Sequence, residues 1–588
     1  MYDLAATRIG LVRKVLGSEV TVELDEAIAG VAPIFEGKVI SIGQIGSLVR
    51  IPQGMVDLLA TVTLVGIAAL EGVQEPGVKY DSGSRWLQVQ LLGQIDRGTG
   101  HFDRGVGAFP GLDDAVHFAV AAELGSVFPS AGDEHVAIGA LSAANDVEVA
   151  LNLEKLVMRH SAVVGSTGSG KTSAVTSILQ RIVNGGWVSA NVIVIDTHGE
   201  YEHALGGMAS VRSVLAQGDS RLFIPYWALP AADILRAFTG ATANGGTIKR
   251  FASLVTEARR RYLESAVWLQ IDEAAVTADT PISFDIRAVW FAFDSENQET
   301  RNETADPRSV QIVELGDADT LTPTQYVPYA PGSKKPSRGP QYDSHGSVPE
   351  LLRLGLLDPR LSFLRGDDGP PQGSDPLQQA IEQWLGHDKA ISVLNFSGVP
   401  AEAAELAIGV VLQLLFETSI RTPPGVVGIG RPRPLLLVLE EAHRYVGDAA
   451  TPMAKKAVNT IAREGRKYGV GLMLVTQRPS ELPDTALAQC GTIVALRLTN
   501  GSDQSKIRQA LPDNVAGLAE TLPALRTGEA IINGEAAMLP SRTRLFLPDP
   551  MPLAEDPSVK PWRATPSTPD VAPALAVWRG IYEGESSA

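Results

Sequence analysis

The chain has 588 residues, too many for one hydrophobic core, so we expect several structural units of roughly 100–200 residues each. Apolar residues make up 44% and charged residues 20%, and we see strand-length apolar runs rather than the roughly 20 residues that cross a bilayer, which predicts a globular protein without a membrane segment. Acidic residues number 67 against 50 Lys and Arg, a net charge of −17, so any contact with a nucleic acid must be local.

Cysteine and histidine usage limits the chemistry further. Cys490 is the single cysteine, which excludes an intrachain disulfide, and the nine histidines are scattered without zinc-ligand spacing. The N-terminal stretch MYDLAATRIGLVRKV lacks the continuous apolar block of a signal peptide. We therefore expect a cytoplasmic location, and a metal ion only where a nucleotide brings one.

The first half of the chain predicts a barrel followed by an α/β unit. Residues 1–145 contain short β-rich runs separated by Gly, Pro and Asp, which is typical of a small closed β-barrel. In residues 146–229 an apolar strand, a Gly-rich loop, a helix and a second apolar strand follow one another, as in a βαβ unit.

The second half predicts an insertion and the remainder of the same sheet. Residues 230–388 alternate helical stretches with polar segments, which indicates a helical insertion with mobile loops. Strand-like runs return in residues 389–546 and continue the parallel sheet. Residues 547–588 begin Pro-rich, and we expect an extended C-terminal arm.

The stretch GSTGSGKT matches the eight-position phosphate-loop pattern and has a strand before it and a helix after it. Its glycines let backbone N–H groups surround phosphates, Lys171 reaches the β and γ oxygens, and the Thr172 hydroxyl is a Mg²⁺ ligand. A chance Gly-rich loop is the alternative. We expect ATP and Mg²⁺ as cofactors, with nucleotide contacts from Gly165, Ser166, Thr167, Gly168, Ser169, Gly170, Lys171, Thr172 and Ser173.

Two glutamates end the apolar run LLLVLEEAH. Glu440 is predicted to hold the Mg²⁺ shell, and Glu441 to polarise the attacking water as general base. The alternative is two ordinary surface acids at a strand end. Asp196, at the end of NVIVID, is a third metal candidate or else the cap of the next turn. Spacing alone assigns no catalytic role to His198 or Glu200.

A basic turn precedes the apolar strand in AREGRKYGVGLMLVTQRPSEL. Arg463, Arg466 and Lys467 should project at the sheet edge, where an arginine can face the nucleotide site of a neighbouring subunit. Gln477, at the carboxyl end of that strand, is placed to sense the γ-phosphate or its attacking water. A solvated helix face is the alternative for the arginines.

Together, RHSAVVGSTGSGKT, VIVIDTHGEY, LLLVLEEAHRY and the basic turn with its Thr-Gln-Arg-Pro strand end resemble the HerA family of hexameric ATPases, within the wider HerA–FtsK group. The resemblance spans nearly the whole chain. It implies an N-terminal barrel of the HAS kind, a RecA-like core, a helical insertion and a C-terminal arm that braces against the neighbour. It also implies that Arg466 acts in trans, with Arg159 as a second basic candidate; an arginine that covers a strand end is the alternative for Arg159. Glu440 departs from the Asp that is commoner in the family.

The resemblance also implies partners. Family members form six-subunit rings that encircle duplex DNA and translocate along it, with a separate nuclease of the NurA type or a sirtuin-like or nuclease effector in antiphage defence, docked on the barrel face. DNA contacts are expected among basic clusters of the insertion: Lys249 and Arg250, Arg259 to Arg261, and Lys334, Lys335 and Arg338. For each cluster, a solvated face is the alternative.

Two other functions stay open. A nucleotide-gated ring could assemble and regulate an effector with little movement on DNA, which the acidic charge balance favours slightly. A polymer pump of the conjugative-secretion branch would need a membrane anchor, which we do not expect here.

Overall fold

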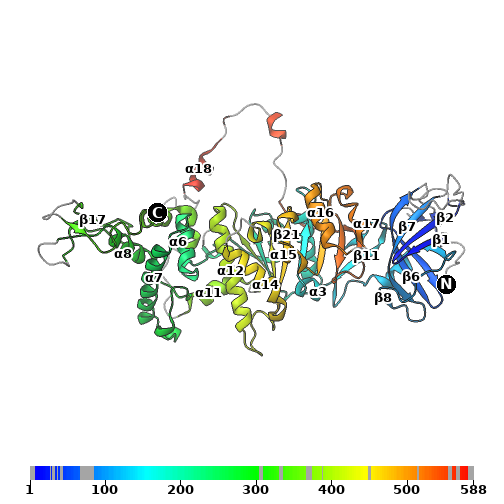
Figure 1. The fold of residues 1–588 in the computed structure, drawn as a ribbon, viewed down its shortest axis with the longest axis horizontal. Helices are drawn as coiled ribbons and strands as arrows, with labels where there is room; N and C mark the ends of the chain where they lie inside the picture. Colours follow the sequence, from blue (N-terminus) through cyan, green and yellow to red (C-terminus); the bar gives the residue numbers. More distant parts are fainter. Residues whose placement is uncertain are drawn as a thin grey trace.

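The computed structural model describes residues 7–26, 28, 34–35, 38–39, 44–66, 85–216, 218–302, 309–329, 336–365, 374–386, 388–447, 452–512, 515–553, 559–563, 568 and 570–579. The molecule is elongated (Figure 1): a blue β-barrel lies at one end, an α/β core in the middle and a green helical insertion at the other end. This arrangement confirms the predicted fold class.

The N-terminal sheet is a closed barrel. Its strand order is β2-β1-β9-β5-β6-β7-β8, and the pairing of β2 with β7 closes it. Buried side chains such as Val20, Val22 and Leu58 fill the interior. The strands are β1 (Arg8–Leu16), β2 (Glu19–Leu24), β5 (Leu48–Gln53), β6 (Val56–Gly66), β7 (Trp86–Asp96), β8 (Phe102–Arg104) and β9 (Ala115–Phe118); β3 (Ile34–Phe35) and β4 (Lys38–Val39) form a separate pair.

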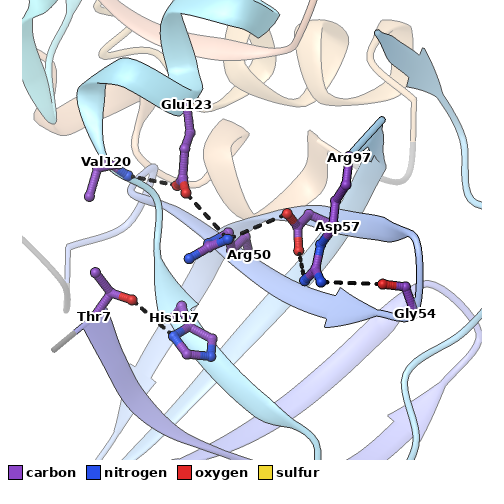
Figure 2. Close-up of polar contacts among 8 residues, drawn as sticks. All are labelled: Thr7, Arg50, Gly54, Asp57, Arg97, His117, Val120 and Glu123. Atoms are coloured by element: carbon purple, nitrogen blue, oxygen red, sulfur yellow. Dashed lines mark hydrogen bonds and ion pairs between the residues drawn. The ribbon is translucent and has the colours of Figure 1, made fainter. Parts of the chain in front are cut away.

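A buried ion network ties the barrel to the short helix α2 (Ala121–Val127), which leads into the core (Figure 2). Nη1 of Arg50, on β5, lies 3.4 Å from Oδ2 of Asp57 and 3.3 Å from Oε1 of Glu123. Arg97 also pairs with Asp57, at 2.6 Å. Burial raises the pKa of Glu123, and the charge of Arg50 acts against that shift. Because buried charges need partners, this network favours one docking of α2 on the barrel.

His117, on β9, is expected to make the stability of the barrel depend on pH. Burial and the nearby Arg50 lower its pKa to about 4, and Thr7 Oγ1 lies 3.0 Å from its Nδ1. Unfolding restores a pKa near 6.5, so below that pH the unfolded state binds more protons than the folded state. We expect the free energy of unfolding to fall by up to about 2 kcal/mol between about pH 7 and pH 5. Urea unfolding should show a flatter pH dependence for His117→Gln; an unchanged slope would contradict the assignment.

The core contains a sheet with the order β11-β10-β24-β23-β22-β12-β21-β20-β13-β19-β14. Pairs from β22 to β14 are parallel, and pairs from β11 to β22 are antiparallel. The strands are β10 (His135–Leu141), β11 (Ala144–Asn152), β12 (Ser161–Val164), β13 (Val192–Asp196), β14 (Ala209–Ser213), β19 (Ile391–Asn395), β20 (Leu435–Leu439), β21 (Val470–Thr476), β22 (Thr492–Leu496), β23 (Glu529–Gly534) and β24 (Ser541–Leu545).

Both faces of this sheet are buried, which explains its continuous apolar strands. Along β13, Ile193 packs into one core cluster, with α12 and α14, whereas Val194 packs into the other, with α4. The helices around the sheet are α3 (Leu153–Met158), α4 (Lys171–Asn184), α5 (Glu202–Leu205), α12 (Ala401–Arg421), α13 (His443–Val446), α14 (Pro452–Glu464), α15 (Asp484–Ala488), α16 (Gly501–Ala510) and α17 (Ala516–Ala519).

The barrel and the core do not meet at residue 145. Strands β10 and β11 pair with each other, and β10 also pairs with β24, so both belong to the central sheet. The boundary expected between residues 145 and 146 therefore falls inside this hairpin. Composition could not reveal this, because a hairpin has the same local pattern in a barrel and at a sheet edge.

The insertion is mainly helical, with α6 (Ala231–Thr239), α7 (Gly245–Ser265), α8 (Ile286–Gln298), α9 (Val348–Leu357), α10 (Ser362–Arg365) and α11 (Pro376–Trp384). Two small antiparallel pairs accompany these helices: β15 (Thr300–Arg301) with β18 (Ser337–Arg338), and β16 (Ile312–Glu314) with β17 (Gln325–Tyr326). The pair of β16 and β17 lies at the end of the molecule farthest from the barrel (Figure 1).

Helix α12 corrects the expectation that apolar runs are of strand length. It has 21 residues and a mean hydropathy of 1.6 in its most apolar window, enough by length and composition to cross a membrane, and 67% of that window is buried inside the protein. Its apolar side chains, including Leu406, Val410 and Leu415, pack in the core. The high hydropathy therefore corresponds to packing of most of the helix surface in the core.

The C-terminal arm leaves the core beside α4. The side-chain amide of Gln180 accepts from Asp549 N at 2.8 Å and donates to Pro550 O at 3.0 Å. In the red C-terminal part of the chain (Figure 1), α18 (Ala572–Trp578) is a helix where an extended chain was expected. Trp562, in a 3₁₀ turn of the arm, is 86% exposed.

Candidate functional site

The phosphate loop joins β12 to α4. Gly168 and Gly170 have φ values of 72° and 97°, in the left-handed region that favours glycine. A Cβ at Gly165 would lie 2.5 Å from Ser169 Oγ and 2.9 Å from Leu496 Cβ, so a side chain is excluded there. The hydroxyl of Ser169 is buried and has no hydrogen-bond partner within the described part of the chain. The loop can therefore surround a phosphate with backbone N–H groups, and the Ser169 hydroxyl is available as a further hydrogen-bonding group.

Lys171 begins α4 and is surrounded by acids. Burial lowers its pKa, and the negative charges of Glu440, Glu441 and Glu200 act against that shift. The lysine is 9% exposed, so little water screens these charges. An anionic phosphate would compensate the buried cation in the same way as the carboxylates do.

Glu440 and Glu441 follow β20, beside the phosphate loop. Burial raises the pKa of Glu440 to about 8, and the neighbouring charge of Glu441 adds to this, while a hydrogen bond from Tyr201 opposes it. The Tyr201 hydroxyl donates to Oε2 of Glu440 at 2.6 Å. A carboxyl group with such a pKa retains its proton near neutral pH unless a cation stabilises the ionised form.

Glu441 is held in a strained position. Its φ of 50° is unusual for a residue with a side chain, and such strain is concentrated at functional sites. Burial alone would raise its pKa, but contact with His443 and the charges of His443 and Lys171 lower it on balance. His443 Nδ1 lies 3.2 Å from Oε2 of Glu441 and 3.1 Å from the Thr476 hydroxyl. An ionised carboxylate held in this way suits a general base.

Gln477 reaches the phosphate loop from the carboxyl end of β21. The Thr167 hydroxyl donates to Oε1 of Gln477 at 2.6 Å, and Gly165 N donates to Thr476 O at 3.3 Å. On the other side of the loop, Thr499 N donates to Ser166 Oγ at 3.0 Å. The loop is therefore bound to β21 and to the segment that follows β22, and Gln477 lies at the carboxyl end of β21, as the sequence predicted.

Asp196 caps the loop after β13, which is the alternative that the sequence offered beside its predicted metal role. Its carboxylate accepts from the backbone N–H groups of His198, Gly199 and Tyr201 at 3.1, 2.8 and 3.2 Å. Both oxygens accept from the loop after β13. Glu200 lies beside the predicted metal ligand Thr172, whose Oγ1 donates to Glu200 Oε2 at 2.7 Å.

The residues present fit a magnesium nucleotide. Thr172, Glu200, Glu440 and Glu441 supply oxygen ligands of the kind that Mg²⁺ prefers, directly or through water, and the cation would neutralise charge on the phosphates. Among the residues that the structure describes, no group of three or more His, Cys, Asp or Glu side chains forms a metal site by itself.

The predicted basic residues lie at the opposite edge of the sheet. Arg159 precedes β12, Arg466 precedes β21, and these strands pair in parallel, from Ser161 with Met473 to Val164 with Thr476. Arg463 and Arg466 are exposed, whereas Arg159 is half-buried and lies 3.4 Å from Glu535. None of the three is at the phosphate-loop edge, where both strands end.

Sequence reasoning missed four residues around the nucleotide site: Glu200, Tyr201, His443 and Thr476. Glu200 and Tyr201 had one detectable signal, because they follow the strand-ending Asp196 at the carboxyl edge. His443 follows Glu441 by two residues in EEAH, so the sequence spacing alone could have predicted that the two side chains lie close together. The contact of Thr476 with His443 could not be predicted from spacing, because it depends on the pairing of β20 with β21.

The basic clusters of the insertion need a correction. Arg259 is fully buried, donates to Trp227 O at 2.9 Å and lies over the ring of Phe284, so it cannot contact DNA. Arg250 pairs with Glu296. Lys249, Arg261 and Arg338 are exposed and Arg260 is partly exposed, whereas Lys334 and Lys335 lie outside the described residues.

Arg259→Met should destabilise the protein, and Arg261→Met should not. Loss of the buried guanidinium leaves the carbonyls of Trp227 and Leu229 without this donor, which we expect to lower the free energy of unfolding by about 2–4 kcal/mol. The exposed neighbour should change it by no more than about 0.5 kcal/mol. Urea unfolding of both variants measures the difference; equal effects would mean that Arg259 is not buried as described.

A strand, a phosphate loop and a helix, with acids on the next strands of a parallel sheet, define a P-loop NTPase of the RecA-like class. Residues 136–415 match the family model described as the central domain of helicase HerA, and residues 386–541 match the HerA-like C-terminal domain. The chain belongs to the HerA family. It is an ATPase of the helicase type, with ATP and Mg²⁺ as cofactors.

Individual relatives have low sequence identity to this chain but align with most of its length. A probable helicase of Methanocaldococcus jannaschii is 24% identical over 82% of this chain and 83% of its own length. The DNA double-strand break repair helicase HerA of Sulfolobus acidocaldarius is 27% identical, over 72% of this chain and 71% of its own. Among solved structures, VirB4 of Thermoanaerobacter pseudethanolicus is 13% identical, covering 71% of this chain and 97% of its own, with a TM-score of 0.43.

Proposed function

We propose that this protein is an ATP-driven motor that assembles as a homo-hexameric ring, encircles duplex DNA and translocates along it or unwinds it. Its ATP sites would contain Lys171, Thr172, Glu440, Glu441 and Gln477 from one subunit. Arg466, assisted by Arg159 or Arg463, would come from the next subunit.

The observation that supports shared sites is the separation between the two edges of the sheet. β21 has seven residues, a length of about 20 Å, and lies between Arg466 at its start and Gln477 at its end. An arginine side chain is much shorter than this, so Arg466 cannot reach the phosphate loop of its own subunit. A second copy that packs this edge against a phosphate loop would complete the site, as arginine fingers do in other P-loop enzymes.

The partner of such a motor is a separate chain. We propose a nuclease of the NurA type, or a sirtuin-like or nuclease effector, docked on the barrel face, in DNA end processing or antiphage defence in the cytoplasm. The barrel supports this placement because it forms one end of the molecule, away from the insertion (Figure 1). The core packing of α12 is consistent with a location away from membranes.

DNA-stimulated ATP hydrolysis tests the motor against a nucleotide-gated scaffold. We expect linear duplex DNA to raise the hydrolysis rate several-fold, and the double variant Arg260→Glu/Arg261→Glu to lose most of that increase while its DNA-free rate is unchanged. The salt dependence of DNA binding should also weaken, because fewer phosphate contacts release fewer counterions.

Arg421→Glu is the matched control, because it reverses the charge of an exposed arginine at the end of α12. This variant should keep the DNA-stimulated increase in ATP hydrolysis. A hexamer that hydrolyses ATP but ignores DNA would contradict the motor and favour the scaffold. A monomer in the presence of ATP, measured by light scattering, would contradict both.

A further inference from the structure

An arginine of the barrel holds a loop of the motor core. Arg104, at the end of β8, donates from Nε to Met538 O at 2.8 Å and from Nη2 to Gly534 O at 3.0 Å, and it also bonds Ala537 O. One guanidinium thus binds three carbonyls of the β23–β24 connection. Since β8 belongs to the barrel sheet, Arg104 joins this loop to the barrel, while Ala536 joins it to the core by accepting from Asn152 N at 2.8 Å and donating to Thr492 Oγ1 at 3.1 Å.

The same loop carries an acid to one of the predicted trans arginines. Oε2 of Glu535 lies 3.4 Å from Nε of Arg159. Two backbone hydrogen bonds fix the position of Glu535 relative to Arg159. Glu535 N donates to Gly491 O at 2.8 Å, and Gly491 N donates to Arg159 O at 2.7 Å. Gly491 has no room for a side chain, as its Cβ would lie 2.9 Å from Arg159 Cβ.

The backbone on the other side of Arg159 is fixed as well. His160, with a φ of 52°, is buried, and its Nδ1 accepts from Leu472 N at 3.0 Å. Arg159 is therefore anchored at its backbone while its side chain remains half-exposed. Only the side chain of Arg159 can therefore change conformation, and in this structure it pairs with the carboxylate of Glu535.

We propose that Glu535 restrains Arg159 in the isolated subunit and that Arg104 makes this restraint responsive to the barrel. Arg159 would exchange the carboxylate of Glu535 for the phosphates at the neighbouring subunit's site. A partner that shifts the barrel would withdraw Arg104 from the Gly534–Met538 loop, loosen the position of Glu535 and so release Arg159. This inference rests on the proposed trans role of Arg159 and adds a control to it.

The energetics suit a reversible restraint. Both side chains of the pair are partly exposed, at 37% for Arg159 and 47% for Glu535, so water screens the attraction. Phosphates carry more charge than one carboxylate, so an assembled site would compete successfully for the arginine. Arg104 provides the firmer contact, because one planar guanidinium satisfies three acceptors at once.

Steady-state ATP hydrolysis by the full chain tests this with Glu535→Gln, Arg159→Gln and the double variant. We expect Glu535→Gln to raise kcat about three- to tenfold with little change in KM, Arg159→Gln to lower kcat, and the double variant to match Arg159→Gln alone. Arg104→Lys, which keeps the charge but loses the fork of donors, should raise kcat in the wild-type background and have no effect with Glu535→Gln.

Glu350→Gln is the matched control, since it removes an acid from another partly exposed pair, with Arg353 on α9, and should leave kcat unchanged. If Glu535→Gln leaves kcat unchanged or lowers it while Arg159→Gln is impaired, the restraint is refuted and the trans role stands. If Arg159→Gln hydrolyses ATP as the wild type does, the trans role of Arg159 is refuted, and the restraint with it.

Discussion

Replacing Glu441 by Gln is expected to reduce ATP turnover by about 10²–10⁴-fold while ATP binding is retained. The glutamine has the same shape but cannot accept a proton from the attacking water. Its position is fixed by the strained backbone and by His443, so the substitution should remove chemistry and little structure. Hydrolysis at saturating ATP and calorimetric titration with ATP and Mg²⁺ measure the two effects separately.

Glu481→Gln is a suitable control, because Glu481 lies in the turn after β21, at the same carboxyl edge of the sheet, and pairs with exposed Arg478. It should hydrolyse ATP at the wild-type rate. A Glu441→Gln protein with near-normal turnover would show that another group activates the water. A variant that no longer binds ATP would show that Glu441 contributes to binding instead of to the chemical step.

Arg466→Ala should lower turnover by roughly 10³–10⁵-fold, the range documented for arginine fingers, without dissociating the proposed ring. The reason is that Arg466 is exposed at the amino edge of the sheet and has no part in its own subunit's phosphate cradle. Lys456→Ala removes another exposed cation from helix α14 and should have little effect. Hydrolysis assays combined with light scattering separate lost catalysis from lost assembly.

Mixing the two inactive variants tests the trans arrangement directly. A subunit with Arg466→Ala keeps its Glu441, and a Glu441→Gln neighbour keeps its Arg466, so mixed interfaces should recover activity that neither variant shows alone. Recovery should rise and then fall with the mixing ratio. An inactive mixture of properly assembled subunits, or an active Arg466→Ala protein, would exclude Arg466 as the finger.

Sequence patterns sufficed for features built from neighbouring residues. The phosphate loop, from Gly165 to Thr172, is one continuous segment whose glycines are required by local backbone conformation, so its spacing alone indicates its use. Strands buried on both faces, such as β13 and β20, appear as uninterrupted apolar runs, which made the parallel core predictable. The glutamate pair was found because acids that end a buried strand are costly without a function.

Contacts between distant segments required the tertiary structure. The bond from Tyr201 to Glu440, the capping of the Asp196 loop, the burial of Arg259 and the grip of Arg104 on the Gly534–Met538 loop each depend on how elements pack. An arginine in a basic triplet has the same local pattern whether it faces solvent or a core carbonyl. The sequence by itself therefore determined the ATP-binding chemistry and the family, because these depend on local spacing. Only the fold decided which charges are free to act, because that depends on burial and on partners hundreds of residues away.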